Sequence, residues 1–248
     1  MNVRIFKNVS YTLCLLVIVL SNPACKKDKT ESRVQPGDFL SGSSFDKLIV
    51  EVQCVGGHEP TPGTLDNLKD FLHQRLNKGA GIHVVVNTIP SPGKSTLSLD
   101  EIRDIEKNNR TQRTSGKTLT AYFLFADADY SDNQGNSKVL GVAYGNTSMV
   151  IFEKTIKEFS GGLGKPSATV LESTVSLHEF GHILGLTNNG TPMQSSHQDE
   201  PNGKHCNNKD CLMYWSVENS DVVSTLLGGS IPALDANCIA DLRANGGR

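Results

Sequence analysis

The sequence predicts an α/β fold with a mixed sheet, and the pattern of apolar residues supports this in three ways. Short apolar segments at residues 45–54, 82–87 and 119–125 alternate with two segments whose apolar residues recur at helical spacing. Strands that alternate with helices in this way form parallel sheets. A pair of apolar segments around Gly145 then predicts an antiparallel edge hairpin, and a long apolar helix follows.

Each predicted helix in the first half carries its own boundary signals. Residues 64–78 have leucines at helical spacing, with Thr64 suited to cap the start and Gly79 suited to end the helix. The second helix starts at Ser98, because Ser98 and Glu101 have the spacing of a capping box. Both helices therefore serve as crossover connections that back the sheet.

The second half contains the hairpin and two further helices. Residues 138–144 and 148–152 are the two arms of the hairpin. Residues 167–185 form a long apolar helix, and residues 232–244 form a short helix that closes the chain. The stretch between these helices is rich in Asn, Gly, Ser and Pro and is expected to be loop.

Composition restricts the classes of protein to which the chain can belong. It has 248 residues, of which 37% are hydrophobic, with 24 Lys and Arg against 26 Asp and Glu and a formal net charge of −2. This balance is not that of a nucleic-acid-binding protein, so no nucleic-acid partner is expected. No apolar run reaches the ~18–20 residues that a membrane-spanning helix needs. We expect a monomer.

The N-terminal residues resemble an export signal. Residues 1–24 combine two basic residues with an apolar run at 11–20, which is typical of a signal peptide. Ala24 before Cys25 resembles a bacterial lipobox, which implies that Cys25 is lipidated, although cleavage by ordinary signal peptidase stays open. Residues 25–44 then form a flexible tether. The implied location is the bacterial cell envelope, at the outer membrane, with the domain periplasmic or surface-exposed.

Four cysteines remain in the predicted domain, which spans residues 45–248. An even number of cysteines in an exported protein favours disulfides. Cys206 and Cys211 are close enough in sequence to close a small loop, which leaves Cys54 to pair with Cys238. Four free thiols are the alternative.

The long helix carries the residues that predict chemistry. His178 and His182 are four apart in an HExxH pattern and project from one face, where both imidazoles can bind one Zn²⁺. Glu179 lies beside the metal and can act as general base and then general acid for an attacking water. A zinc site of this kind needs a third ligand. Two later histidines are candidates, His205 and, as the alternative, His197.

The segment from His205 to Met213 reads HCx4CxM, and with HExxHxxG it resembles the metzincin zinc peptidases, most closely the archaemetzincin branch. The resemblance implies a metzincin-like single domain and makes His205 the third ligand, although the family's usual position corresponds to Asn188. It also implies that Met213 forms an apolar floor beneath the zinc, known as the Met-turn. The family's later CxxC, which helps bind a second zinc, is absent, so one catalytic zinc ion is expected. The hairpin would supply the edge strand above the cleft.

Two residue patterns near the predicted site leave alternatives open. Tyr214 follows Met213 and is a candidate to stabilise an oxyanion, with a role in the core or at the surface as the alternative. Asp127, Asp129 and Ser131 match the start of a calcium-binding loop. The match fails further on, so turn chemistry explains the aspartates equally well.

These observations predict a membrane-anchored zinc endopeptidase that hydrolyses peptides or proteins. The alternative is a non-catalytic, zinc-containing surface lipoprotein that binds a peptide, a glycan or an envelope partner. The two differ at the metal, because a side chain in the fourth coordination position closes the site to water.

Overall fold

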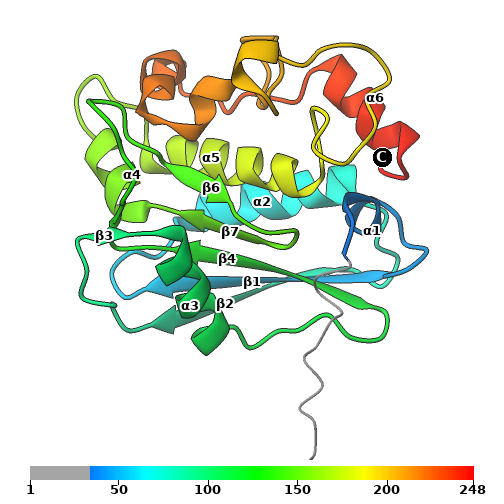
Figure 1. The fold of residues 1–248 in the computed structure, drawn as a ribbon, viewed down its shortest axis with the longest axis horizontal. Helices are drawn as coiled ribbons and strands as arrows, with labels where there is room; N and C mark the ends of the chain where they lie inside the picture. The colour runs from blue at the N-terminus through cyan, green and yellow to red at the C-terminus, as the bar shows by residue number, and fades with distance from the viewer. Residues whose placement is uncertain (1–33) are drawn as a thin grey trace, which may run out of the picture.

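The computed structural model describes residues 34–248 and has an α/β fold (Figure 1). Its main sheet has five strands in the order β2-β1-β4-β7-β6. The first four strands of this order are mutually parallel, and β6 pairs with β7 in the antiparallel direction. The strands are β1 (Lys47–Val55), β2 (Ile82–Ile89), β4 (Thr118–Phe125), β6 (Gly141–Ala143) and β7 (Ser148–Ile151). The predicted sheet with its antiparallel edge is confirmed.

Helices cover both faces of the sheet (Figure 1). On one face lie α2 (Pro62–Arg75) and α5 (Ala168–Ile183), which pack against each other. On the other face, α3 (Leu99–Asn109) covers a smaller core around Tyr122 and Leu124. The alternation of side chains along β4 explains the two cores, because Phe123 and Phe125 point to the opposite face, toward α5.

The domain begins earlier than the sequence predicts. Residues 34–44, expected to belong to the tether, include the short helix α1 (Pro36–Leu40), whose Phe39 and Leu40 are fully buried. The ring of Phe39 meets that of Phe180 on α5 edge-on, with 5.7 Å between the centroids. Burying these apolar side chains stabilises the segment against the domain. The predicted signal peptide and Cys25 lie outside the described residues.

The remaining elements lie around this framework. β3 (Thr96–Leu97) pairs with β5 (Asp129–Tyr130), and α4 (Glu153–Phe159) follows β7. Beyond α5 come three 3₁₀ helices, η2 (Glu200–Asn202), η3 (Trp215–Glu218) and η4 (Ser220–Gly228), and then α6 (Ala236–Ala244). Within residues 34–248 no helix has the length and apolar character needed to cross a membrane.

Asp129 is engaged by side chains of the chain itself. Its carboxylate accepts hydrogen bonds from Lys154 at 2.8 Å and from the Thr155 hydroxyl at 2.7 Å. The lysine therefore supplies the positive charge that a calcium ion would bring to this carboxylate.

Candidate metal centre

The helix α5 places two histidines one turn apart at the centre of the molecule. Ser167 caps its start by accepting a hydrogen bond from the Val170 amide. From Leu171 to Ile183 every residue of this helix is buried, including His178 and His182. Their rings lie 4.7 Å apart between centroids, nearly perpendicular to each other. Because the surrounding helix is apolar, these imidazoles need partners to offset the cost of burial.

The chain turns sharply after this helix and returns a third histidine. Gly185 has φ +76°, and an added Cβ would lie 2.7 Å from the backbone nitrogen of Thr191, so only glycine fits here. Asn188 donates its side-chain amide to Gln198 and is exposed, away from the two histidines. His205 reaches them instead, with its ring 5.4 Å from that of His178 and 5.1 Å from that of His182.

Backbone carbonyls set which nitrogen of two imidazoles is free to bind. His178 Nδ1 donates to the carbonyl of Leu212 at 2.7 Å, and His205 Nδ1 donates to the carbonyl of Asn202 at 2.7 Å. Each neutral ring therefore keeps a lone pair on Nε2. His178 Nε2 and His182 Nε2 are only 3.1 Å apart. Lone pairs that converge in this way fit a bound cation, and fixing the tautomer through Nδ1 is usual for histidines that bind metals.

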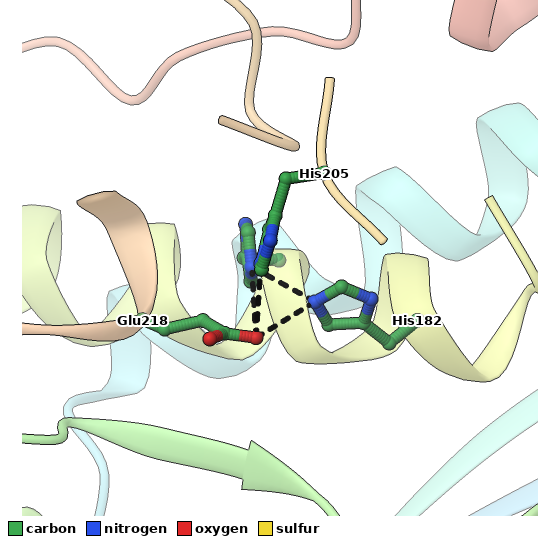
Figure 2. Close-up of side chains that lie close together, drawn as sticks. His182, His205 and Glu218 are labelled. Atoms are coloured by element: carbon green, nitrogen blue, oxygen red, sulfur yellow. Dashed lines mark hydrogen bonds and ion pairs between the residues drawn. The ribbon is translucent and has the colours of Figure 1, made fainter. Parts of the chain in front are cut away.

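Glu218, at the end of η3, joins the three histidines and was not predicted. Its Oε1 lies 3.0 Å from Nε2 of His182 and 3.0 Å from Nε2 of His205 (Figure 2). The same oxygen is 3.7 Å from His178 Nε2. Together the four side chains form a group that can hold a metal ion. In the sequence, Glu218 is the first carboxylate after Met213, and no periodic pattern marks it.

Electrostatics in this group follow from burial and mutual contact. Burial lowers the pKa of His182 to about 4, with a further contribution from the neighbouring histidines. Burial also lowers the pKa of His205, but the contact with Glu218 outweighs it and raises the net value. The Glu218 carboxyl has its pKa held far below the usual range by the three imidazoles, which outweigh its own desolvation. Without a metal, the pocket thus favours a charged Glu218 carboxylate, a neutral His182 and protonation of His205.

Glu179 is fully buried beside the cluster, and no side chain donates a hydrogen bond to either of its carboxylate oxygens. Burial, and secondly the Glu218 charge, raise its pKa well above the usual value, and the backbone amide of Ala143 offsets this only in part. A buried acid without a side-chain partner is costly, which marks this residue as a candidate for function. It lies against β6, where an added Cβ at Gly141 would be 3.0 Å from Glu179 Oε1.

Met213 and Tyr214 occupy different surroundings. Met213 is fully buried, and its sulfur packs against the glycine of the HEFGH motif, Gly181, whose missing side chain makes room for it. Met213 therefore lies against the helix that carries the histidines. The ring of Tyr214 packs on Trp215, with centroids 5.8 Å apart, and Tyr214 is absent from the lining of the neighbouring cavity.

A cavity of about 420 Å³ opens beside the cluster. It reaches from the edge strand to the loop that carries His205. Its lining residues are Tyr130, Val139, Gly141, Val142, Ala143, His182, Asn189, Asn202, Lys204, His205 and Glu218. Two histidines, the carboxylate of Glu218 and the whole of β6 thus face the same space.

His197 lies in a second cluster, away from the three histidines described above. Its Nδ1 is 3.6 Å from Cys206 Sγ and 4.0 Å from Cys238 Sγ. Its Nε2 contacts Asp241 Oδ2 at 2.7 Å, so it donates its proton there and keeps the lone pair on Nδ1 toward the sulfurs. His197, Cys206 and Cys238, together with Asp235, form a second group that can hold a metal ion.

The predicted disulfides Cys206–Cys211 and Cys54–Cys238 are not present. All four cysteines are free and buried. Cys54 lies on β1 with its thiol near the carbonyl of Asn87, at 3.6 Å, whereas the sulfur of Cys238 is 3.7 Å from that of Cys211. Cys54 and Cys238 do not form a disulfide, because β1 places Cys54 against β2 whereas α6 brings Cys238 to the other two cysteines.

Cys211 has the surroundings of a thiolate. Hydrogen bonds from the thiols of Cys206 and Cys238 lower its pKa to about 4. Its sulfur also accepts backbone N–H donors from Met213 at 3.4 Å and Asp235 at 3.3 Å. A deprotonated sulfur is the form that binds metals.

No protein-family model matches the sequence, and a search of the curated proteins finds no match. The described residues do contain two buried groups of histidine, carboxylate and cysteine side chains that can bind metal ions.

Proposed function

We propose that the protein is a zinc-dependent endopeptidase whose metal is held by His178, His182 and His205. One observation carries the proposal. Three imidazoles meet beside Glu179, which is fully buried and has no side-chain hydrogen-bond partner. Zn²⁺ suits imidazole ligands, and three protein ligands with a further position for water or substrate are typical of catalytic zinc.

The chain's own residues can then carry the proton transfers of peptide hydrolysis. A zinc ion bound here lowers the pKa of water and polarises a peptide carbonyl. Glu179 takes a proton from the attacking water and passes it to the nitrogen of the leaving amine.

The strand β6 offers a way to hold an extended substrate. It is the edge of the main sheet, and all three of its residues line the cavity next to the cluster. An extended peptide can add to a free sheet edge through main-chain hydrogen bonds. Such binding accepts many sequences, which is consistent with an endopeptidase acting on peptides or proteins.

The non-catalytic alternative is favoured by one contact, that of Glu218 with all three histidines. If this carboxylate remains on the metal, four side chains close the site and water has no position. The protein would then be a metal-containing binding lipoprotein. The fully buried Glu179, which no side chain pairs, argues against this, because a permanently closed site leaves that carboxylate without a role.

The second cluster fits a structural metal ion. His197, Cys206, Cys238 and Asp235 form this cluster, and the sulfur of Cys211 lies 3.7 Å from that of Cys238. Three sulfurs and one imidazole are therefore available, a ligand set that occurs in structural zinc sites. We propose that this ion ties α6 to the loop that carries His205 and so fixes that histidine. The sequence predicted one catalytic zinc ion and gave no indication of this second cluster.

The lipid anchor at Cys25 and the location in the cell envelope are proposed from the sequence. The anchor would hold the domain at a membrane surface. Metabolic labelling with a palmitate analogue tests this, with Cys25→Ala as the control that should lose the label.

The peptidase proposal is tested with a chain that begins at Lys26, which retains Val34 and Phe39 in the core. The zinc-loaded protein is incubated with a proteome-derived peptide library, and products are sequenced by mass spectrometry. We expect cleavage by the parent and none by Glu179→Gln with zinc still bound. Equal cleavage by both would show that Glu179 is not the general base, and cleavage by neither would favour the binding lipoprotein.

A further inference from the structure

We propose that Glu218 is a fourth, displaceable protein ligand of the resting metal centre, so that the site is latent until this side chain leaves the metal. The inference rests on the proposed function, because it concerns regulation of the same three-histidine site. It also explains how Glu218 can contact the three histidines while Glu179 beside them keeps a role in catalysis.

The distances fit a tetrahedral set. A metal ion bound at ~2.0–2.1 Å by four ligands keeps neighbouring ligand atoms about 3.3 Å apart. The observed separations are 3.1 Å between Nε2 of His178 and His182, 3.0 Å from Glu218 Oε1 to Nε2 of both His182 and His205, and 3.7 Å to His178. Each value lies within about 0.4 Å of that tetrahedral spacing. The carboxylate oxygen therefore lies where the fourth ligand belongs.

Hydrogen bonding alone explains the contact less well. Oε1 lies at hydrogen-bond distance from Nε2 of His182 and His205, at 3.0 Å, whereas Nε2 of His178 is 3.7 Å away. His205 already donates from Nδ1 to a backbone carbonyl, so it would have to be positively charged to donate to Oε1 as well. His182 Nε2 lies 3.1 Å from Nε2 of His178 and 3.0 Å from Oε1, so it would have one proton for two acceptors. A single shared cation satisfies the three lone pairs and the carboxylate at once.

The backbone of Glu218 is held in place while its side chain has room to move. Its carbonyl accepts from the Leu140 amide at 2.8 Å, and the Ser220 amide donates to the carbonyl of Lys138 at 2.8 Å. These bonds fix the segment around Glu218 to the residues that lead into β6. The side chain, by contrast, is 36% exposed and lines the cavity. Opening therefore requires only rotation of the side chain into the cavity.

This arrangement makes Glu218 a competitor of whatever enters the fourth position. In the resting state the carboxylate takes the position of water, and a substrate that displaces it allows hydrolysis to begin. A ligand that binds the metal must displace it, and its apparent affinity falls by the cost of that displacement. Replacing Glu218 should remove the cost of displacement while the three histidines still bind the metal.

Cobalt(II) and azide test the proposal directly. The protein is loaded with Co²⁺, and azide is titrated while the visible absorption of the metal is followed. We expect Glu218→Ala to bind azide at least about tenfold more tightly than the parent, which is about 1.4 kcal/mol. Glu218→Gln keeps the side-chain volume and should behave like Glu218→Ala. Asp221→Asn, an exposed acid in the same segment, is the matched control and should behave like the parent.

The outcomes separate this inference from the function on which it rests. Equal azide affinity in the parent and both Glu218 variants, with cobalt bound, would overturn the role of Glu218 and leave the three-histidine site intact. A parent with no more cobalt than His178→Ala would overturn both. Tighter azide binding by the Glu218 variants would support the inference even where no cleaved peptide has been found.

Discussion

Replacing Gly141 by Ala should misplace the catalytic glutamate without touching a metal ligand. Gly141 begins β6, and its φ is not positive, so alanine is allowed there by the backbone. The added Cβ would lie 2.7 Å from Val175 Cγ1 and 2.9 Å from Glu179 Cγ. Carbon atoms prefer separations of ~3.5–4.0 Å, so Glu179 or β6 must move by about 0.5–1 Å.

The magnitude follows from that displacement. Overpacking of this size costs about 1–3 kcal/mol of folding stability. A shift of ~1 Å in a reacting group can lower turnover by about 10²-fold. We therefore expect Gly141→Ala to keep its metal, unfold at a lower temperature and cleave peptides about a hundredfold more slowly than the parent.

The assay compares Gly141→Ala with Gly145→Ala in the same hairpin. At Gly145 the nearest atom to an added Cβ is Ser148 Cβ at 3.7 Å, which is ordinary contact, so this variant should match the parent. Metal content, melting temperature and the rate on a peptide found in the library screen are measured for all three. Full turnover by Gly141→Ala would refute the position assigned to Glu179, and loss of its metal would show that the change acts on the ligands instead.

Three further outcomes are expected. His205→Ala should lose the histidine-site metal, whereas His197→Ala should release the other ion, so metal analysis should find two ions in the parent and one in each variant. Cys238→Ser should lower the melting temperature in metal-replete buffer, and a chelator should abolish that difference. Burial raises the pKa of Glu153 to about 9 in the folded protein, from an ordinary value of 4.5. Between these two pH values the folded protein holds a proton that the unfolded chain has released. Stability should therefore fall as pH rises from about 5 to 9, by at most about 1.4 kcal/mol per pH unit. Glu153→Gln should flatten the urea-measured slope, and an unchanged slope would show that Glu153 is not its source.

Local patterns explain how much of the fold could be predicted. The helices α2, α3 and α5 carry caps and apolar residues at helical spacing, and their positions follow from the sequence within a few residues. The cap of α2 is Thr61, which accepts from the amide of the predicted cap Thr64, and the helix ends at Arg75, before Gly79. The helix α1 has no such pattern, because it is five residues long and its two buried residues are embedded in a polar segment. Its place depends on Phe39 meeting Phe180, a contact that no local pattern indicates.

Part of the candidate site could likewise be predicted from local patterns, and part could not. His178, Glu179 and His182 are on one helix, so their spacing alone predicts that they share a site. Glu218 comes from a 3₁₀ helix anchored to the segment before β6, and its arrival depends on that long-range pairing.

The cysteines show the same limitation. Counting them predicted disulfides, whereas the fold gathers Cys206, Cys211 and Cys238 around His197 and leaves Cys54 in the sheet. The partner of a cysteine is set by tertiary structure, and sequence spacing alone cannot supply it.

A crystal of the zinc-loaded protein, with anomalous scattering recorded above and below the zinc absorption edge, tests the central claim most directly. We expect a peak about 2.1 Å from Nε2 of His178, His182 and His205. A second peak should lie among the cysteines and His197. Zinc bound only at the cysteines, with the three histidines free of metal, would contradict the assignment of a catalytic metal centre.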